Sequence, residues 1–249
     1  MNTYTLMKLY SELAEWYPIF SAPKEFKKEA AFFARVFSKA TTPPPRRLLE
    51  LGSGAGNIAS HLKARFELTL VDLSPGMLAV SKALNPECEH LTGDIRRVRL
   101  GRTFDAVFVH DAIAHMTTEK DLRAVMETAF VHLRPGGVAI FVPDDTRETF
   151  IEGDTDHGGN DTDRRSVRFV QWTTDPNPRD TTYVVDFAIL IRDERGQTRS
   201  VHDRHTYGLF PRATWRRLMR DVGFQVNPTR VNLDSFPRDV FLGRRRQKL

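Results

Sequence analysis

Three glycines, Gly52, Gly54 and Gly56, stand within five residues directly after an apolar segment. Glycine adopts backbone angles that other residues avoid, and its missing side chain lets a ligand come within contact distance of the main chain. An apolar strand that runs into such a turn is typical of a site for a nucleotide-like cofactor. Glu50 precedes the first glycine by two residues, and Asn57 stands where a G-x-G-x-x-G turn would have its third glycine. The glycine spacing therefore argues against a dinucleotide.

A second apolar segment, residues 67–72, ends in Asp72, which lies 20 residues beyond Gly52. A carboxylate at the end of such a strand can accept both hydroxyls of an adenosine ribose. The amides of the glycine turn, at the start of the following helix, can receive the polar end of the same cofactor. The two segments predict neighbouring strands with a cofactor across their ends.

Four motifs, in order along residues 46–142, resemble those of the class I S-adenosylmethionine (SAM) methyltransferases. They are the acid-x-G-x-G-x-G turn, the strand that ends in Asp72, the segment Gly93-Asp94-Ile95, and the Leu-Arg-Pro-Gly-Gly turn at residues 133–137. The resemblance implies that SAM binds here, that S-adenosylhomocysteine is the product, and that no metal is needed. It places Asp94 at the adenine amino group and Met77 on the adenine ring, although a core role accounts for Met77 equally well. The cofactor-binding residues that it implies are Tyr10, Glu50, Gly52, Gly54, Gly56, Asp72, Leu73, Met77, Asp94, Ile95 and His110.

Two histidines, His110 and His115, follow the predicted strand at residues 104–110. Ligands of open α/β sheets lie at the carboxyl ends of the strands, so both side chains are candidates for catalysis. An amine with a pKa near that of lysine is mostly protonated at neutral pH, and a positioned histidine can take its proton before methyl transfer. Each histidine can equally serve only to shape the loop. The signature [DNS]-P-P-[FYW] is absent, which argues against methylation of nucleic-acid bases.

Residues 141–150, the segment after them and residues 204–210 resemble a narrower group, the nucleotide-aminosugar N,N-dimethyltransferases. Tyr10 and Tyr17 lie in a segment similar to that group's N-terminal Tyr-x-x-x-Ala, which closes over the cofactor. The chain departs from the group at residues 142–144, where Val-Pro-Asp stands in place of Glu-Pro-Trp.

Residues 166–174, 181–192 and 198–207 alternate apolar and polar side chains and predict three antiparallel strands inserted over the acceptor. On the last of them His202 and Arg204 share one face and His205 the other, and one face should meet the substrate. An ordinary sheet position accounts for each histidine as well, and packing for Trp172. The candidate substrate contacts are Tyr17, Asp145, Trp172, His202, Arg204 and His205.

Composition limits the setting of the protein. The 249 residues, 40% of them hydrophobic, suffice for one large α/β domain. The single cysteine, Cys88, excludes an internal disulfide framework and gives no zinc signature. No signal peptide or membrane span is apparent, and we expect a cytoplasmic protein. A net charge of +5 and a basic end at residues 244–248 are balanced by 32 interspersed acids, so the basic end reads as solvated and argues little for nucleic acid as a partner. A homodimer is possible, since dimers are common in the resembled group.

Strand and helix alternate from residue 46 to residue 143, which predicts a parallel sheet covered by helices on both faces. The expected fold class is α/β, a Rossmann-like seven-stranded methyltransferase sheet with an N-terminal helical cap. The cap is expected at residues 1–42, the SAM-binding core at 46–143, the antiparallel insert at 144–210 and the C-terminal part of the core at 211–249. Strands are expected near 138–142, 224–231 and 240–243, and a mobile loop at 153–165.

The sequence therefore predicts a SAM-dependent methyltransferase that acts on a polar small molecule, with an amine as the favoured acceptor. The alternatives are a small-molecule O- or C-methyltransferase and a SAM-binding protein without turnover.

Overall fold

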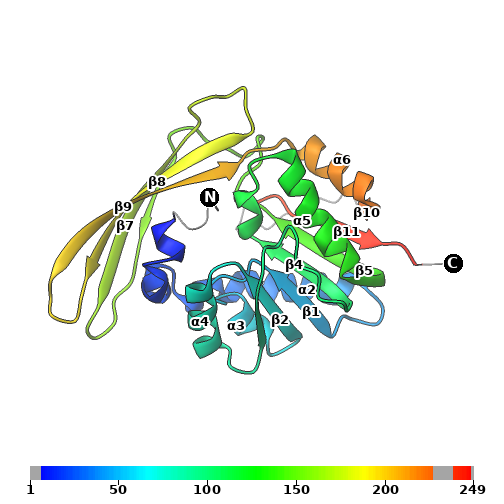
Figure 1. Cartoon of the computed structure of the whole chain (residues 1–249), viewed down its shortest axis with the longest axis horizontal. Helices are drawn as coiled ribbons and strands as arrows, with labels where there is room; N and C mark the ends of the chain where they lie inside the picture. The colour runs from blue at the N-terminus through cyan, green and yellow to red at the C-terminus, as the bar shows by residue number, and fades with distance from the viewer. Residues whose placement is uncertain (1–6, 227–237, 248–249) are drawn as a thin grey trace.

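The computed structural model describes residues 7–226 and 238–247, and its centre is a seven-stranded sheet (Figure 1). The strand order is β10-β11-β5-β4-β1-β2-β3; β1 to β5 are parallel, and β11 is antiparallel to both of its neighbours, β5 and β10. The strands are β1 (Arg47–Leu51), β2 (Glu67–Asp72), β3 (Glu89–Thr92), β4 (Phe104–His110), β5 (Leu133–Val142), β10 (Phe224–Val226) and β11 (Phe241–Arg245). The expected α/β fold with a seven-stranded sheet is confirmed.

Helices cover both faces of this sheet because successive residues of a buried strand point to opposite sides. Leu48 of β1 packs with Phe33 and Phe37 of α2, while Leu49 packs with the side chains of α5 and α6. No helix within residues 7–226 and 238–247 is long and apolar enough to cross a membrane. The helices are α1 (Tyr17–Phe20), α2 (Lys27–Ala40), α3 (Ala59–Leu62), α4 (Pro75–Leu84), α5 (Glu119–Val131) and α6 (Arg212–Val222), with 3-10 helices η2 (Lys8–Tyr10), η3 (Ala14–Trp16), η4 (Pro23–Phe26) and η5 (Ala112–His115).

A second, antiparallel sheet stands beside the first, with strand order β6-β7-β8-β9 (Figure 1). Its strands are β6 (Thr155–Gly158), β7 (Ser166–Thr174), β8 (Thr182–Arg192) and β9 (Thr198–Gly208). The prediction of three strands is wrong by one, because β6 lies inside the segment 153–165 that was expected to be a loop. The edge of β7 offers unpaired backbone groups, and pairing with them outweighs the loop-forming composition of this segment.

The N-terminal segment lies between the two sheets (Figure 1). The first part of the expected helical cap forms η2, η3 and the short α1, and these turns pack against the second sheet. Leu9, Leu13, Trp16 and Phe20 share a hydrophobic core with the inner face of the second sheet. The amide of Leu9 also donates to Asp203 Oδ2 on β9, at 2.8 Å. The cap is therefore fastened to the inserted strands as well as to the core.

The last strands differ from their predicted extent. β5 begins five residues before the predicted start at residue 138, because Gly136 takes a φ of +82° and the register with β4 shifts there. β11 runs on through Arg245, whose guanidinium donates to the carbonyl oxygens of Phe130 and Leu133 at 3.0 and 2.7 Å. The expectation of a solvated basic end is therefore wrong for Arg245. Residues 227–231, expected to continue β10, lie outside the described residues.

Gly56 is required by the packing of the glycine turn on α4. It has a φ of +74°, and a Cβ there would overlap Ser81 Oγ and Asn85 Nδ2. We expect Gly56→Ala to lower the free energy of unfolding by about 2–4 kcal/mol, because backbone strain adds to overpacking. Gly101 is the matched control, since it has a φ of +67° and nothing within 4 Å of an added Cβ. Urea unfolding measures both variants, and equal losses would contradict the packing role.

Candidate functional site

A cavity of about 320 Å³ opens where the parallel strands end at one edge of the seven-stranded sheet. The loops at this edge leave the crevice in which ligands of open α/β sheets bind. The ends of β1, β2, β4 and β5 and the N-terminal segment line it. The lining includes ten of the predicted cofactor residues, namely Tyr10, Glu50, Gly52, Gly54, Asp72, Leu73, Met77, Asp94, Ile95 and His110, and also Tyr17 and His115.

Asp72, at the end of β2, is held by backbone amides. Its Oδ2 accepts the N–H of Gly54 and its Oδ1 that of Ser74, both at 2.8 Å. Burial raises the pKa of Asp72, although the hydrogen bonds from these amides oppose the rise. Each carboxylate oxygen has a second lone pair, so Asp72 can still accept hydroxyl groups of a ligand in the cavity.

Glu50 lines the cavity and is buried, with 2% of its surface exposed. Burial raises the pKa of Glu50 to about 8; His110 opposes the rise, and the carboxylates of Asp72 and Asp111 add to it. Within the described part of the chain, Glu50 Oε2 has no hydrogen-bond partner. A buried acceptor of this kind calls for a donor, and a cationic one relieves the burial best. The residues therefore fit SAM, which carries an ammonium and a sulfonium.

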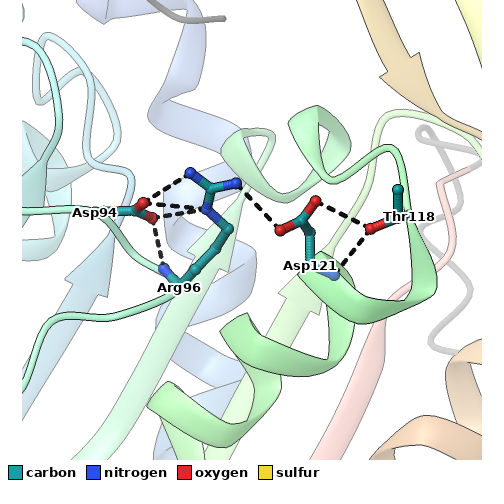
Figure 2. Close-up of polar contacts among 4 residues, drawn as sticks. All are labelled: Asp94, Arg96, Thr118 and Asp121. Carbon is teal, nitrogen blue, oxygen red and sulfur yellow. Dashed lines mark hydrogen bonds and ion pairs between the residues drawn. The ribbon is translucent and has the colours of Figure 1, made fainter. Parts of the chain in front are cut away.

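Asp94 is fixed by Arg96 (Figure 2). Arg96 donates from Nε to Asp94 Oδ1 at 3.0 Å and from Nη2 to Oδ2 at 2.7 Å. Its Nη1 donates to Asp121 Oδ1 at 3.1 Å, so the pair is tied to the first turn of α5. Burial acts to raise the pKa of Asp94, but the hydrogen bonds from Arg96 hold it below its ordinary value. Asp94 is thus an ionised acceptor of fixed orientation at the cavity.

His110 lies between two carboxylates. Its Nε2 is 2.8 Å from Glu29 Oε1, and its Nδ1 is 3.2 Å from Asp111 Oδ2. Burial lowers the pKa of His110, but Asp111 and Glu29 outweigh burial and the net shift is upward. A histidine held in this way is stabilised as a cation, which makes it a poor acceptor for a further proton. The geometry favours the structural alternative for His110.

Asp111 and Asp144 share the guanidinium of Arg238. Arg238 is hydrogen-bonded to Asp111 Oδ1, and its Nη2 lies 3.1 Å from Asp144 Oδ1. Burial raises the pKa of Asp144 to about 7; Asp111 adds to the rise and Arg238 opposes it. Asp111 has a φ of +53°, an uncommon value for a residue other than glycine. The wall of the cavity after β4 therefore contains two carboxylates, those of Asp111 and Asp144, that share one guanidinium.

Aromatic side chains complete the lining. The ring centroid of His115 lies 5.5 Å from that of Tyr10 and 4.9 Å from that of Tyr207. Burial lowers the pKa of His115 to about 3, and the neighbouring His205 adds to the effect. His115 is therefore a neutral member of an aromatic cluster at neutral pH.

Six predicted site residues lie outside the lining. Trp172, 43% exposed, lies on the outer face of the second sheet with His202 and Arg204, which both lie 2.8 Å from Asp186 Oδ1. The alternation along β9 was predicted correctly, but its outer face points away from the cavity, so these three contacts with substrate are not supported. The others are Gly56 beneath the turn, Asp145 beside Thr149, and His205 behind the aromatic cluster.

The sequence reasoning did not select Asp111, Asp144, Tyr207 and Arg238. The sequence contains a signal that could have pointed to Asp144, since this residue stands where the chain departs from the resembled group. Arg238 had none, because it meets Asp111 from 127 positions away. Within residues 7–226 and 238–247, no group of three or more His, Cys, Asp and Glu side chains is arranged to hold a metal ion.

The fold and the cavity agree with comparisons to known proteins. Residues 48–137 match a family model described as a methyltransferase domain. Over 205 residues the chain is 27% identical to dTDP-3-amino-3,4,6-trideoxy-alpha-D-glucopyranose N,N-dimethyltransferase of Streptomyces venezuelae, covering 82% of this chain and 85% of that protein. With its glycine turn and its acids at the ends of β1 and β2, the chain is a class I SAM-dependent methyltransferase.

Solved structures place it more narrowly. The chain is similar to Streptomyces venezuelae DesVI, with a TM-score of 0.82 and 25% identity over 92% of this chain and 97% of that one. It is also similar to the SAM-bound amino pentose methyltransferase of Micromonospora echinaspora, with a TM-score of 0.76 and 27% identity over 88% and 91% of the two chains. The second sheet and the cap are thus part of a shared architecture.

The buried Glu50 makes the stability of the protein depend on pH. Its folded-state pKa of about 8 lies above its ordinary value of 4.5, so the unfolded chain loses this proton first as the pH rises. This contribution to stability is fully present at low pH and is lost between these two pKa values, with a loss of roughly 2–4 kcal/mol. Glu50→Gln should remove it. Urea unfolding at about pH 5.5 and about pH 8 measures both proteins. The free energy of unfolding of the variant should rise relative to that of the wild type at the higher pH. An unchanged difference would contradict the raised pKa of Glu50.

Arg96 should hold Asp94 in place for the adenine. We expect Arg96→Gln to weaken SAM binding by about 1 kcal/mol, because the carboxylate regains rotational freedom, while kcat at saturating SAM is kept. Arg102→Gln is the control, since Arg102 pairs with Glu89 at the surface. Calorimetric titration measures both, and tighter binding by Arg96→Gln would show that Arg96 competes with the cofactor for Asp94.

Proposed function

We propose that this enzyme methylates an amine of a small polar molecule, a nucleotide-linked aminosugar. One observation carries the proposal. The cavity that contains Glu50 and Asp72 extends to Asp111, Asp144 and His115, so a single space can take the cofactor and an acceptor together. SAM, when bound, supplies an activated methyl group on a sulfonium sulfur.

The chain's own residues hold the cofactor from several sides. The turn at Gly52 and Gly54 leaves backbone exposed at the cavity, Asp72 accepts hydroxyl groups, and Asp94 accepts an amino group. Glu50 lies where its open oxygen can accept from an ammonium. Holding both partners in one orientation is a large part of the rate enhancement of a displacement at carbon.

The wall formed by Asp111 and Asp144 favours an amine over a hydroxyl. When an amine takes a methyl group, positive charge arises on nitrogen, and preorganised carboxylates stabilise charge that develops in a water-poor cavity. Arg238 and the cationic His110 face three carboxylates, those of Glu29, Asp111 and Asp144, so the wall keeps a negative charge when Asp144 is ionised. His115 and the tyrosines then shape the acceptor side without adding charge. Relatives that act on amino groups of dTDP-sugars support this class of substrate.

A panel of acceptors tests the proposal. The enzyme is incubated with SAM and with a dTDP-aminosugar, the free aminosugar, the matched dTDP-sugar that has a hydroxyl in place of the amine, and a phenol. We expect methyl groups on the amine of the dTDP-aminosugar and none on its hydroxyl counterpart, because only the nitrogen becomes cationic. Mass spectrometry of the products is the measurement. Preferred methylation of the hydroxyl compounds would replace the proposal with O-methylation.

A further inference from the structure

Three titratable side chains of β9 stand behind the aromatic cluster of the cavity. His205 is fully buried, with its Nδ1 2.8 Å from the Tyr207 hydroxyl and its Nε2 2.9 Å from Asp203 Oδ2. The three residues alternate along one face of the strand, and Tyr207 lines the cavity. They connect the acceptor side with a carboxylate that lies outside it.

The hydrogen bonds of this group have a defined direction. Burial opposes ionisation of Asp203, but hydrogen bonds from His205 and from the Leu9 amide hold its pKa below the ordinary value. An ionised carboxylate only accepts, so the neutral His205 carries its proton on Nε2 and its Nδ1 accepts. The Tyr207 hydroxyl therefore donates to His205, away from the cavity. Its oxygen accepts from the Tyr10 hydroxyl. A phenol oxygen has two lone pairs, so one remains for a donor on the cavity side.

We propose that Tyr207, His205 and Asp203 form a relay that removes a proton from the acceptor amine. The inference rests on the proposed function. The ammonium of the acceptor gives a proton to the Tyr207 oxygen as the Tyr207 hydroxyl proton passes to His205 Nδ1. The freed nitrogen lone pair then bonds to the methyl carbon, and the carbon–sulfur bond breaks with its electron pair left on sulfur. After product release the proton returns along the same path to solvent.

Other groups near the cavity are less suited to this task. His110 is already stabilised as a cation, and burial lowers the pKa of His115 to about 3. Asp144 can accept a proton, but it would then lose its negative charge when the methylated nitrogen becomes cationic. The relay moves the proton to a site next to another carboxylate and leaves the charge of the cavity wall intact.

Rings from three elements surround His205. From η2 the ring of Tyr10 lies 5.2 Å away, from η5 that of His115 at 6.2 Å, and from β8 that of Phe187 at 4.9 Å. Burial keeps the pKa of Tyr10 and Tyr207 well above 10, so both are neutral. Asp203 is thus the charged neighbour of His205, and its carboxylate can pair with a proton that the relay delivers.

The test compares kcat over pH for Tyr207→Phe, His205→Gln and the double variant, with the amine that turns over fastest in the acceptor panel. Each single change should lower kcat by about 10- to 1000-fold, with SAM affinity retained. The double variant should lose little more than either single one, because the two groups act as a unit. The wild-type kcat should fall at low pH, and in the variants this acid limb should move to that of the amine itself. Tyr207→Phe removes one oxygen and carries the test if His205→Gln does not fold.

His202→Gln is the matched control. His202 lies on the same strand, 2.8 Å from the carboxylate of Asp186, but on the outer face with no path to the cavity. It should keep both kcat and its pH profile. Losses that multiply in the double variant, or an unchanged acid limb with a lowered melting temperature, would assign these residues to structure alone and overturn the relay. A wild-type enzyme that methylates none of the amines would overturn the relay together with the proposed function.

Discussion

Several carboxylates lie close together at one edge of the sheet because parallel strands end there. The charge of these carboxylates determines which other groups the site needs. Like charges in a buried space raise one another's pKa and favour any cation that enters. Four of the carboxylates have compensating partners: two backbone amides donate to Asp72, Arg96 pairs with Asp94, and Asp111 and Asp144 share the guanidinium of Arg238. The acids concerned are Glu50, Asp72, Asp94, Asp111 and Asp144. Glu50 lacks full compensation, and this deficit makes the cavity a receptor for a positively charged cofactor.

The cavity has two halves, one for the cofactor and one for the acceptor in the proposed function, and their charges are arranged differently. In the proposed function the cofactor half is made of backbone and of acids, and hydrogen bonds orient Asp72 and Asp94 before any ligand arrives. In the proposed function the acceptor half is made of Asp111, Asp144 and neutral rings, and its negative charge meets a cation that forms only during the reaction. This division places preorganised charge where it has the greatest effect on the barrier.

The cofactor half could be predicted from the sequence because its residues follow strands whose apolar pattern is strong and whose turns need glycine. Glu50, Asp72 and Asp94 are each next to such a signal. The acceptor half could not, because Arg238 and Tyr207 reach the cavity from distant elements. The prediction that Trp172 and His202 contact the substrate is not supported for another reason. The alternation of side chains along a strand assigns residues to two faces, but only tertiary packing decides which face is covered. β6 was missed because pairing with a neighbour outweighs local composition.

The contact between Leu9 and Asp203 has a consequence for how the chain is made. These residues are 194 positions apart, and the core around Leu9, Leu13 and Trp16 needs the inner face of β8 and β9. During synthesis the apolar side chains of the N-terminal segment therefore stay exposed to solvent until β8 and β9 have left the ribosome. Contacts between residues so far apart in the sequence slow folding, and chaperones can bind the exposed hydrophobic surface until the contacts form. The residues around Leu9 therefore complete their packing only after β9 has been made.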